Sequence, residues 1–204
     1  MKDNTLEFYV NKFNCIDNIE DMDLSFIPPI VRRRMSILDK ITISTLNNVF
    51  SDDIQNIVFS SQFGEVERLL KIIAQFRENN EVSPNTFSGS VHNYPVGFFL
   101  FNKQVSIPYN AISSCENSIS NGLLASVISE YDNIIFCYSD IDDNNAKSFA
   151  INLSKKPGKN SSKYLIKVQT NNTNKDNFED FIKLLNGSKN IIETPIYTIE
   201  RVGL

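Results

Sequence analysis

The sequence predicts an α/β sandwich in which strands and helices alternate along the chain. An apolar run at 57–59 is followed by apolar residues at helical spacing over 66–76, which is typical of a strand that passes through a turn into a helix. A second amphipathic pattern at 119–128 precedes NIIFCYSD (133–140). Such a nearly continuous apolar run favours a strand that is buried on both faces. Both observations indicate helices packed on a sheet.

The first half of the chain is predicted to contain two strands and several helices. LEFYV (6–10) reads as a strand. Residues 28–50 form one or two helices that begin near Pro28 and Pro29, where a first turn tolerates proline. The helix after the strand at 57–59 has one apolar face, which we expect to be packed. That face consists of Val66, Leu69, Leu70, Ile73 and Phe76.

A further helix is predicted to begin at Pro84, with Ser83 as its N-cap and Pro95 at a kink or end. Its inward-facing residues are expected to be Phe87, Val91 and Val96. The remaining predicted elements are strands at 106–112, 148–153, 164–170 and 196–202 and a helix at 178–185. Polar, turn-rich segments at 154–163 and 170–177 are expected to be mobile loops.

Composition and charge exclude several classes of partner. With 204 residues, 41% hydrophobic and 22% charged, the chain has the size of one globular domain over 1–204. Its net charge of -4 offers no field that attracts nucleic acid or an anionic membrane. The opening MKDNTLEFYV has no long apolar run, so we expect neither a signal peptide nor a membrane span and place the protein in the cytoplasm.

The cysteine and glycine patterns predict neither a metal site nor a nucleotide site. Cys15, Cys115 and Cys137 are odd in number and far apart, which fits reduced thiols better than disulfides or zinc ligands. Gly64 follows a strand but lacks the further glycines of a dinucleotide fingerprint, and no GKS or GKT is present. We therefore expect no cofactor.

Cys115 and His92 are the candidates for a nucleophile and its base. Cys115 lies between a predicted strand and a predicted helix, where N–H groups and the helix dipole stabilise a thiolate or an oxyanion. His92 is the single histidine and falls within an apolar helical pattern. The alternative for each is structural: a buried thiol, and a core histidine hydrogen-bonded to backbone.

Arg32, Arg33 and Arg34 form a short basic run in an acidic chain. It could hold a phosphate, but a salt-bridged or interface surface is the favoured interpretation. These arginines are candidates for docking an acidic carrier protein or the carboxylates of a partner.

Five segments follow one another from about Phe26 to Asp140: IPPIVRRRMS, VFSSQFGEVERLLKII, SPNTFSGSVHN, AISSCENS and NGLLASVISEYDNIIFCYSD. Together they resemble the N-terminal domain of β-ketoacyl synthases, specifically the short ketosynthase-like proteins of aryl polyene and flexirubin-type pigment biosynthesis. The resemblance implies half of a thiolase-like ketosynthase fold, a mixed sheet flanked by helices. It also implies that the chain forms a heterodimer with a full-length ketosynthase and that it interacts with an acyl carrier protein.

The family mechanism requires a cysteine at a strand-to-helix turn and two histidines from the second half of the fold. The resemblance covers the first half of the fold alone. The chain therefore lacks the complete set of one cysteine and two histidines, and we expect no catalysis by this chain. One alignment places Cys115 at the nucleophile position. The favoured one matches Ser118 with the family serine and places Glu116 there, and a carboxylate cannot form the acyl thioester.

By the same resemblance, residues after the Ser-Pro pair reach the partner's acyl tunnel. Asn85 and Thr86 stand where ketosynthases of ordinary fatty acid synthesis carry bulky aromatic residues, which predicts room for a longer, rigid chain. The other residues assigned to the tunnel or interface are Phe87, Ser90 and Asn93.

Three hypotheses about function result. The favoured one is a non-catalytic chain length factor that pairs with a full-length β-ketoacyl-ACP synthase. The second is a stand-alone thiol-dependent acyltransferase or hydrolase that uses Cys115 and His92. The third is a scaffold or carrier-docking module without effect on chain length.

Overall fold

The structure, a computed structural model, describes residues 5–142, 145–169 and 175–203. Its strands are β1 (Thr5–Ile16), β2 (Asn56–Ser60), β3 (Tyr109–Ile112), β4 (Asn133–Asp142), β5 (Asn145–Ser154), β6 (Ser162–Val168), β7 (Ile191–Glu193) and β8 (Tyr197–Val202). Its α-helices are α1 (Pro29–Arg32), α2 (Ile37–Val49), α3 (Val66–Asn79), α4 (Pro84–Ser88), α5 (Tyr94–Lys103), α6 (Ser118–Ile128) and α7 (Phe178–Leu185). Two short 3-10 turns are η1 (Ile19–Asp21) and η2 (Cys115–Asn117).

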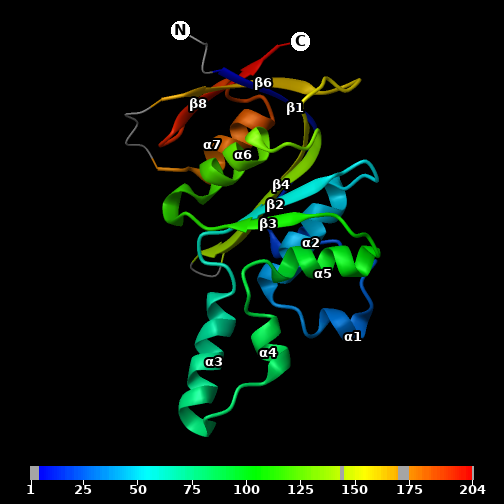
Figure 1. Cartoon of the computed structure of the whole chain (residues 1–204), viewed down its shortest axis with the longest axis vertical. Helices are drawn as coiled ribbons and strands as arrows, with labels where there is room; N and C mark the ends of the chain where they lie inside the picture. Colours follow the sequence, from blue (N-terminus) through cyan, green and yellow to red (C-terminus); the bar gives the residue numbers. More distant parts are fainter. Residues whose placement is uncertain (1–4, 143–144, 170–174, 204) are drawn as a thin grey trace.

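One eight-stranded mixed sheet runs through the described chain in the order β3-β2-β4-β5-β1-β6-β8-β7 (Figure 1). Strand β2 pairs parallel with β3 and β4, whereas β5 is antiparallel to both β4 and β1. The last three strands add antiparallel pairs beyond β1. The mixed sheet with helices on both faces confirms the predicted fold class.

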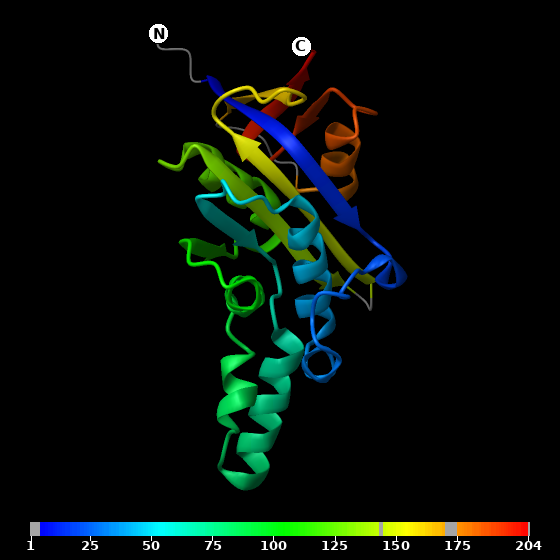
Figure 2. The same ribbon diagram turned by 90° about the vertical axis from the view of Figure 1, so that its right-hand side faces the viewer.

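Two large apolar cores and a small third cluster of Ile16, Ile41 and Ala146 lie between the sheet and its helices. Helices α6 and α7 pack on one face and α2 and α5 on the other (Figure 2). Strand β4 contributes to both cores: Ile134 and Phe136 face α6, while Ile135 and Cys137 face α2 and α5. Residues 134–140 of this strand are buried on both of its faces, as the apolar run predicted.

The N-terminus of α2 is fixed by hydrogen bonds at its N-cap residue, Ser36. The Ser36 hydroxyl accepts from the Asp39 backbone N–H at 2.9 Å, and the Asp39 carboxylate accepts from the Ser36 backbone N–H at 3.0 Å. This reciprocal capping box begins the helix and leaves the Asp39 side chain buried.

Helices α3 and α4 form an arm that projects from the end of the sheet (Figures 1 and 2). The prediction that the apolar face of α3 is packed within the chain is wrong. Within α3, all of which is described, Ile72 alone is buried. The predicted face is uncovered, with exposed fractions from 40% at Ile73 to 60% at Leu70.

The helix predicted from Pro84 is divided in two. Helix α4 ends at Ser88, and Pro95 lies in the first turn of α5, so it helps to begin a helix and does not end one. The inward prediction holds for Val96, which is fully buried. It is wrong for Phe87 and Val91, which are 60% and 41% exposed because they lie on the arm and on the turn after it.

The C-terminal elements match the prediction, with two differences. Strand β7 was not predicted, since three residues carry too little periodicity. Strand β6 ends at Val168, and residues 170–174 of the predicted loop at 170–177 lie outside the described residues. Among the helices that are described, none has the length and apolar character needed to cross a bilayer.

Candidate functional site

The candidate site begins at the turn that joins β3 to α6. Cys115 adopts φ +51, a left-handed backbone that is uncommon outside glycine. Ser118 closes the turn: its hydroxyl donates to the Cys115 carbonyl at 2.7 Å and accepts from the Ser114 N–H at 3.0 Å. The turn leaves Cys115 exposed, whereas Cys137 is buried and Cys15 is half-buried. Such a strained residue at a loop tip is a marker of functional sites in proteins.

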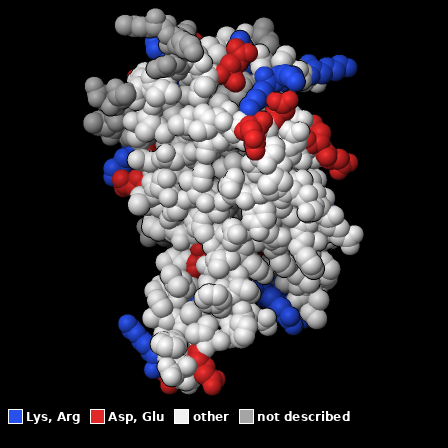
Figure 3. Space-filling view, viewed as in Figure 1, with Lys and Arg blue, Asp and Glu red and all other residues white. Residues whose placement is uncertain are grey.

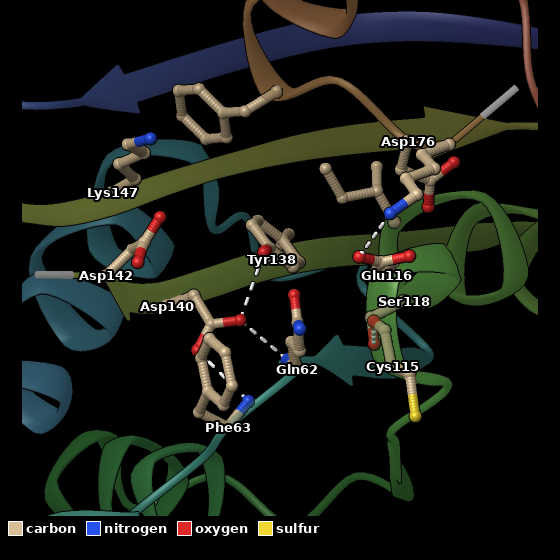
Figure 4. A pocket seen from close by; sticks show the side chains of 13 residues that line it. Gln62, Phe63, Cys115, Glu116, Ser118, Tyr138, Asp140, Asp142, Lys147 and Asp176 are labelled. Atoms are coloured by element: carbon tan, nitrogen blue, oxygen red, sulfur yellow. Dashed lines mark hydrogen bonds and ion pairs between the residues drawn. The ribbon is translucent and has the colours of Figure 1, made fainter.

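A cavity of about 330 Å³ opens beside this turn (Figure 4). It is lined from four parts of the chain: the loop after β2, the turn at Cys115 with the start of α6, the end of β4 with the start of β5, and residues 175–178 at the start of α7. Its lining residues are Gln62, Phe63, Cys115, Glu116, Ser118, Ile119, Tyr138, Asp140, Asp142, Lys147, Lys175, Asp176 and Phe178.

Asp140 organises one wall of the cavity. Its carboxylate accepts from the backbone N–H groups of Gln62 at 2.6 Å and Phe63 at 3.2 Å, and from the Tyr138 hydroxyl at 3.0 Å (Figure 4). It also accepts from the Ser61 hydroxyl at 3.1 Å. These bonds tie the loop that leads into α3 to the end of β4. Asp140 is therefore committed to structure rather than available as a base.

The opposite wall carries further carboxylates. Glu116 forms an exposed ion pair with Lys175 at 2.7 Å. Asp176 accepts from the Ser120 N–H at 2.8 Å, and burial raises its pKa to about 6 although backbone hydrogen bonds lower it. With four carboxylates against two lysines, the cavity does not favour an anionic substrate.

His92 does not line this cavity. It lies in the turn between α4 and α5 rather than within a helix, with Nε2 3.2 Å from the Ile112 carbonyl oxygen and its ring against Phe59. Its Nδ1 faces Gly64, where a Cβ would lie only 2.5 Å away. No hydrogen bond joins His92 to Cys115 among the described residues. These contacts fit a structural role for His92, as a histidine that is hydrogen-bonded to the backbone.

The residues assigned to the tunnel or interface lie together on the arm and the turn after it. Asn85 and Thr86 line a depression of about 620 Å³ between α1, α3, α4 and α5. Its apolar walls are Ile30, Val31, Met35, Tyr94 and Phe98. Phe87 is exposed on the same short helix. Ser90 follows it, and Asn93 precedes α5.

The three arginines do not form one site. Arg32 and Arg33 line a depression of about 450 Å³ together with Lys40. Arg34 instead lines the depression beside Thr86. No ion pair is found for any of these arginines within the described part of the chain.

The sequence interpretation missed the acidic wall of the cavity. The signal for Asp140 was present, since a carboxylate directly follows the buried run of β4. Asp176 gave no such signal, because its proximity to α6 depends on the fold. Over the described ranges, no group of His, Cys, Asp and Glu side chains is arranged to hold a metal ion.

Sheet order, helix layers and the strand-to-helix turn define a thiolase-like ketosynthase fold. The family model for the β-ketoacyl synthase N-terminal domain matches residues 10–140, which is more than half of the chain. The chain belongs to this family. No curated protein matches it in sequence.

Solved structures share the fold at low sequence identity. The structure of a ketosynthase (ApeO) in complex with its chain length factor (ApeC) from Xenorhabdus doucetiae matches with a TM-score of 0.75 at 16% identity, over 96% of this chain and 100% of that one. The ishigamide ketosynthase/chain length factor matches with 0.60 at 8% identity, over 72% and 62%. A β-ketoacyl synthase from Burkholderia phymatum matches with 0.51 at 10%, over 66% and 46%.

Proposed function

We propose that this chain is a non-catalytic ketosynthase-like subunit, a chain length factor, that pairs with a full-length β-ketoacyl-ACP synthase and shapes its acyl tunnel. The products would be polyene or fatty-acyl chains, and the pair would work in the cytoplasm. The single observation that carries this proposal is the uncovered apolar face of α3. Two of the similar structures contain a ketosynthase and a chain length factor, which supports the same assignment.

The apolar face of α3 has the spacing of a helix–helix contact. Its five residues recur every three or four positions, which forms a narrow stripe along the helix. We name this stripe the docking seam: Val66, Leu69, Leu70, Ile73 and Phe76. Contiguous apolar surface of this kind marks protein interfaces, and obligate dimers bury it on assembly.

Other exposed apolar side chains extend the proposed interface. Phe87 on α4 and Phe101 on α5 are 60% and 80% exposed. The face seen in Figure 3 carries few charged side chains across its middle, where Figure 1 places β3 and α5. Depletion of charge is typical of interface cores. Strand β3 is also an edge of the sheet, so its outer backbone groups are open to a partner strand.

Capture from the source organism tests the proposal. The tagged chain is expected to bind a full-length ketosynthase, identified by mass. Leu70→Lys places a charge in the docking seam and should abolish capture. Gln75→Lys puts the same charge on the opposite, exposed side of α3 and should leave capture unchanged. Capture of no ketosynthase, or equal loss in both variants, would contradict the proposal.

The exposed, strained Cys115 keeps the thiol-dependent enzyme as a second candidate. If the partner alone supplies the nucleophile, Cys115→Ala should leave condensation by the assembled pair within about twofold of the parent. Mass analysis after incubation with acyl-ACP should find the acyl group on the partner's cysteine. An acyl group on Cys115, together with loss of turnover in the alanine variant, would support the enzyme instead.

A further inference from the structure

Arg68 joins the arm to the body of the protein. Its Nη2 donates to the Asp39 carboxylate at 2.6 Å and to the Arg34 carbonyl at 3.3 Å, and its Nη1 donates to the Gly89 carbonyl at 2.6 Å. Its guanidinium lies 5.3 Å from the centre of the Tyr94 ring. One side chain on α3 therefore contacts the start of α2, the end of α1, the end of α4 and the start of α5.

A second carboxyl group lies at the same junction. Glu65 precedes α3 and is 6% exposed, and Asp39 is fully buried. The Ser36 hydroxyl donates to Glu65 Oε1 at 2.6 Å, while Glu65 Oε2 lies 3.5 Å from Arg68 Nε. Two buried carboxyl groups thus share one guanidinium, which leaves a net negative charge if both are ionised. An uncompensated buried charge is strongly unfavourable.

One oxygen atom of this cluster lacks a donor. Asp39 Oδ1 is buried and has no hydrogen-bond partner among the described residues. Both carboxyl groups contact the same two residues: Asp39 accepts from the Ser36 N–H and from Arg68, and Glu65 accepts from the Ser36 hydroxyl and lies beside Arg68. A proton on one of the two carboxyl groups removes the excess charge of the cluster.

Gly64 lies where the chain passes from β2 into the arm. Gly64 adopts φ +57, and His92 fills the space where a Cβ would be, so no other residue fits without strain. Helix α3 packs mainly against α4, which belongs to the same arm. The contacts of Arg68 are therefore the principal polar connection between α3 and the body.

We infer that Asp39, Glu65 and Arg68 form a proton-dependent latch that holds the arm, and with it the docking seam, in the position seen in the structure. Loss of that proton leaves two buried carboxylates against one guanidinium and releases the arm about Gly64. This inference rests on the proposed function for its consequence, which is pairing that weakens as pH rises.

The direction of the pH effect follows from linkage. Burial, and then the charge of Asp39, raise the pKa of Glu65 from 4.5 to about 7, and burial also raises the pKa of Asp39. Arg68 opposes both shifts, and Tyr94 is the other ionisable group coupled to them. If release exposes Glu65 to water, its pKa returns to 4.5, so release becomes about tenfold more favourable from about pH 6 to about pH 8.

Hydrogen exchange measured by mass spectrometry tests the latch. Exchange is measured in the Leu70→Lys variant, because the charge that this substitution places in the docking seam limits self-association. An isolated helix of 14 residues is only marginally stable in water, so α3 is expected to open and exchange its amides once the arm is released. After correction for intrinsic rates, protection of peptides from 66–88 should fall about tenfold between about pH 6 and pH 8, and protection of 134–153 should not change. Adding Glu65→Gln should abolish the fall. Adding Glu67→Gln, an exposed carboxylate on the same helix, should preserve it.

Equal arm protection at both pH values would overturn the latch, as would a Glu65→Gln arm that is less protected than its parent near pH 6. Direct titration of the Glu65 carboxyl by carbon NMR in the same parent avoids any folding defect of a variant. A midpoint near 7 is expected, and one near 4.5 would overturn the inference. Neither measurement involves a partner, so failure of the capture experiment would refute the proposed function and leave the latch result intact.

Discussion

Thr86 is a small residue whose replacement by a larger one is expected to change the length of the products. It lines the depression beside Met35 and Phe98 and lies within the arm that carries the docking seam. A phenylalanine at this position would occupy part of that volume. If the depression continues the partner's acyl tunnel, the growing chain would meet a closer end wall.

Thr86→Phe is therefore expected to shorten the products made with the partner synthase while capture of the partner is unchanged. Product length is measured by mass spectrometry of chains released from a reconstituted reaction. Thr86→Val keeps the volume and should leave the length distribution as it was. Identical products from the Phe variant would remove the tunnel role and favour the scaffold hypothesis.

At the residue scale, the sequence identified which side chains are chemically reactive, but it did not show which of them lie close together in the fold. The strand-to-helix location of Cys115 was readable from the pattern around it, and the structure places it at that turn. Its backbone strain was not readable, because a positive φ outside glycine depends on how the fold holds the turn, and Ser118 of this turn is hydrogen-bonded to Ser60 and Ser61 at the end of β2. The contact of His92 with the Ile112 carbonyl likewise needs the turn before α5.

Helix α6 shows how an element is held at a fixed distance from the sheet. A Cβ at Gly122 would lie 2.5 Å from Phe136 Cε2 and 2.8 Å from Ser60 Cβ. The absence of a side chain thus permits the close packing of α6 on β2 and β4.

Gly122→Ala should destabilise the chain by roughly 1–3 kcal/mol, since overpacking outweighs the helix propensity gained. Urea denaturation in the Leu70→Lys chain measures it. Gly203→Ala, where nothing lies within 4 Å of the added Cβ, should change the free energy of unfolding by less than about 0.5 kcal/mol. Equal stability of the two variants would show that α6 can move away from the sheet at little cost.

The prediction of helices and strands succeeded where the apolar residues recur with a clear period. It failed where a proline could either begin or end a helix. Helix α7 was predicted with its observed bounds, because its apolar residues recur with a clear helical period. Pro95 was misjudged, since proline both ends one helix and begins another, and the local sequence does not distinguish the two roles. Strand β1 extends to Ile16, beyond the predicted strand at 6–10, because pairing with β5 from Lys12 to Ile16 supports polar residues that strand propensity alone does not.

The whole molecule explains why the apolar face of α3 was misassigned. The same pattern of apolar residues arises whether a face is covered by the chain's own sheet or by another protein. Only the position of the arm, beyond the end of the sheet, shows that the face is uncovered in this chain. The fold class could thus be predicted from sequence, but the extent of its apolar surface could not.

This surface predicts the behaviour of the chain without a partner. An uncovered docking seam next to exposed Phe87 and Phe101 should drive self-association, because water does not solvate such a stripe favourably. On size-exclusion chromatography with light scattering, the unaltered chain is expected to be larger than a monomer, and Leu70→Lys with Ile73→Lys to be monomeric. Thermal unfolding of the variant should remain cooperative, since both side chains are exposed and leave the cores intact. A monodisperse monomer from the unaltered chain at tens of micromolar would contradict this, because an uncovered apolar seam is expected to associate at that concentration.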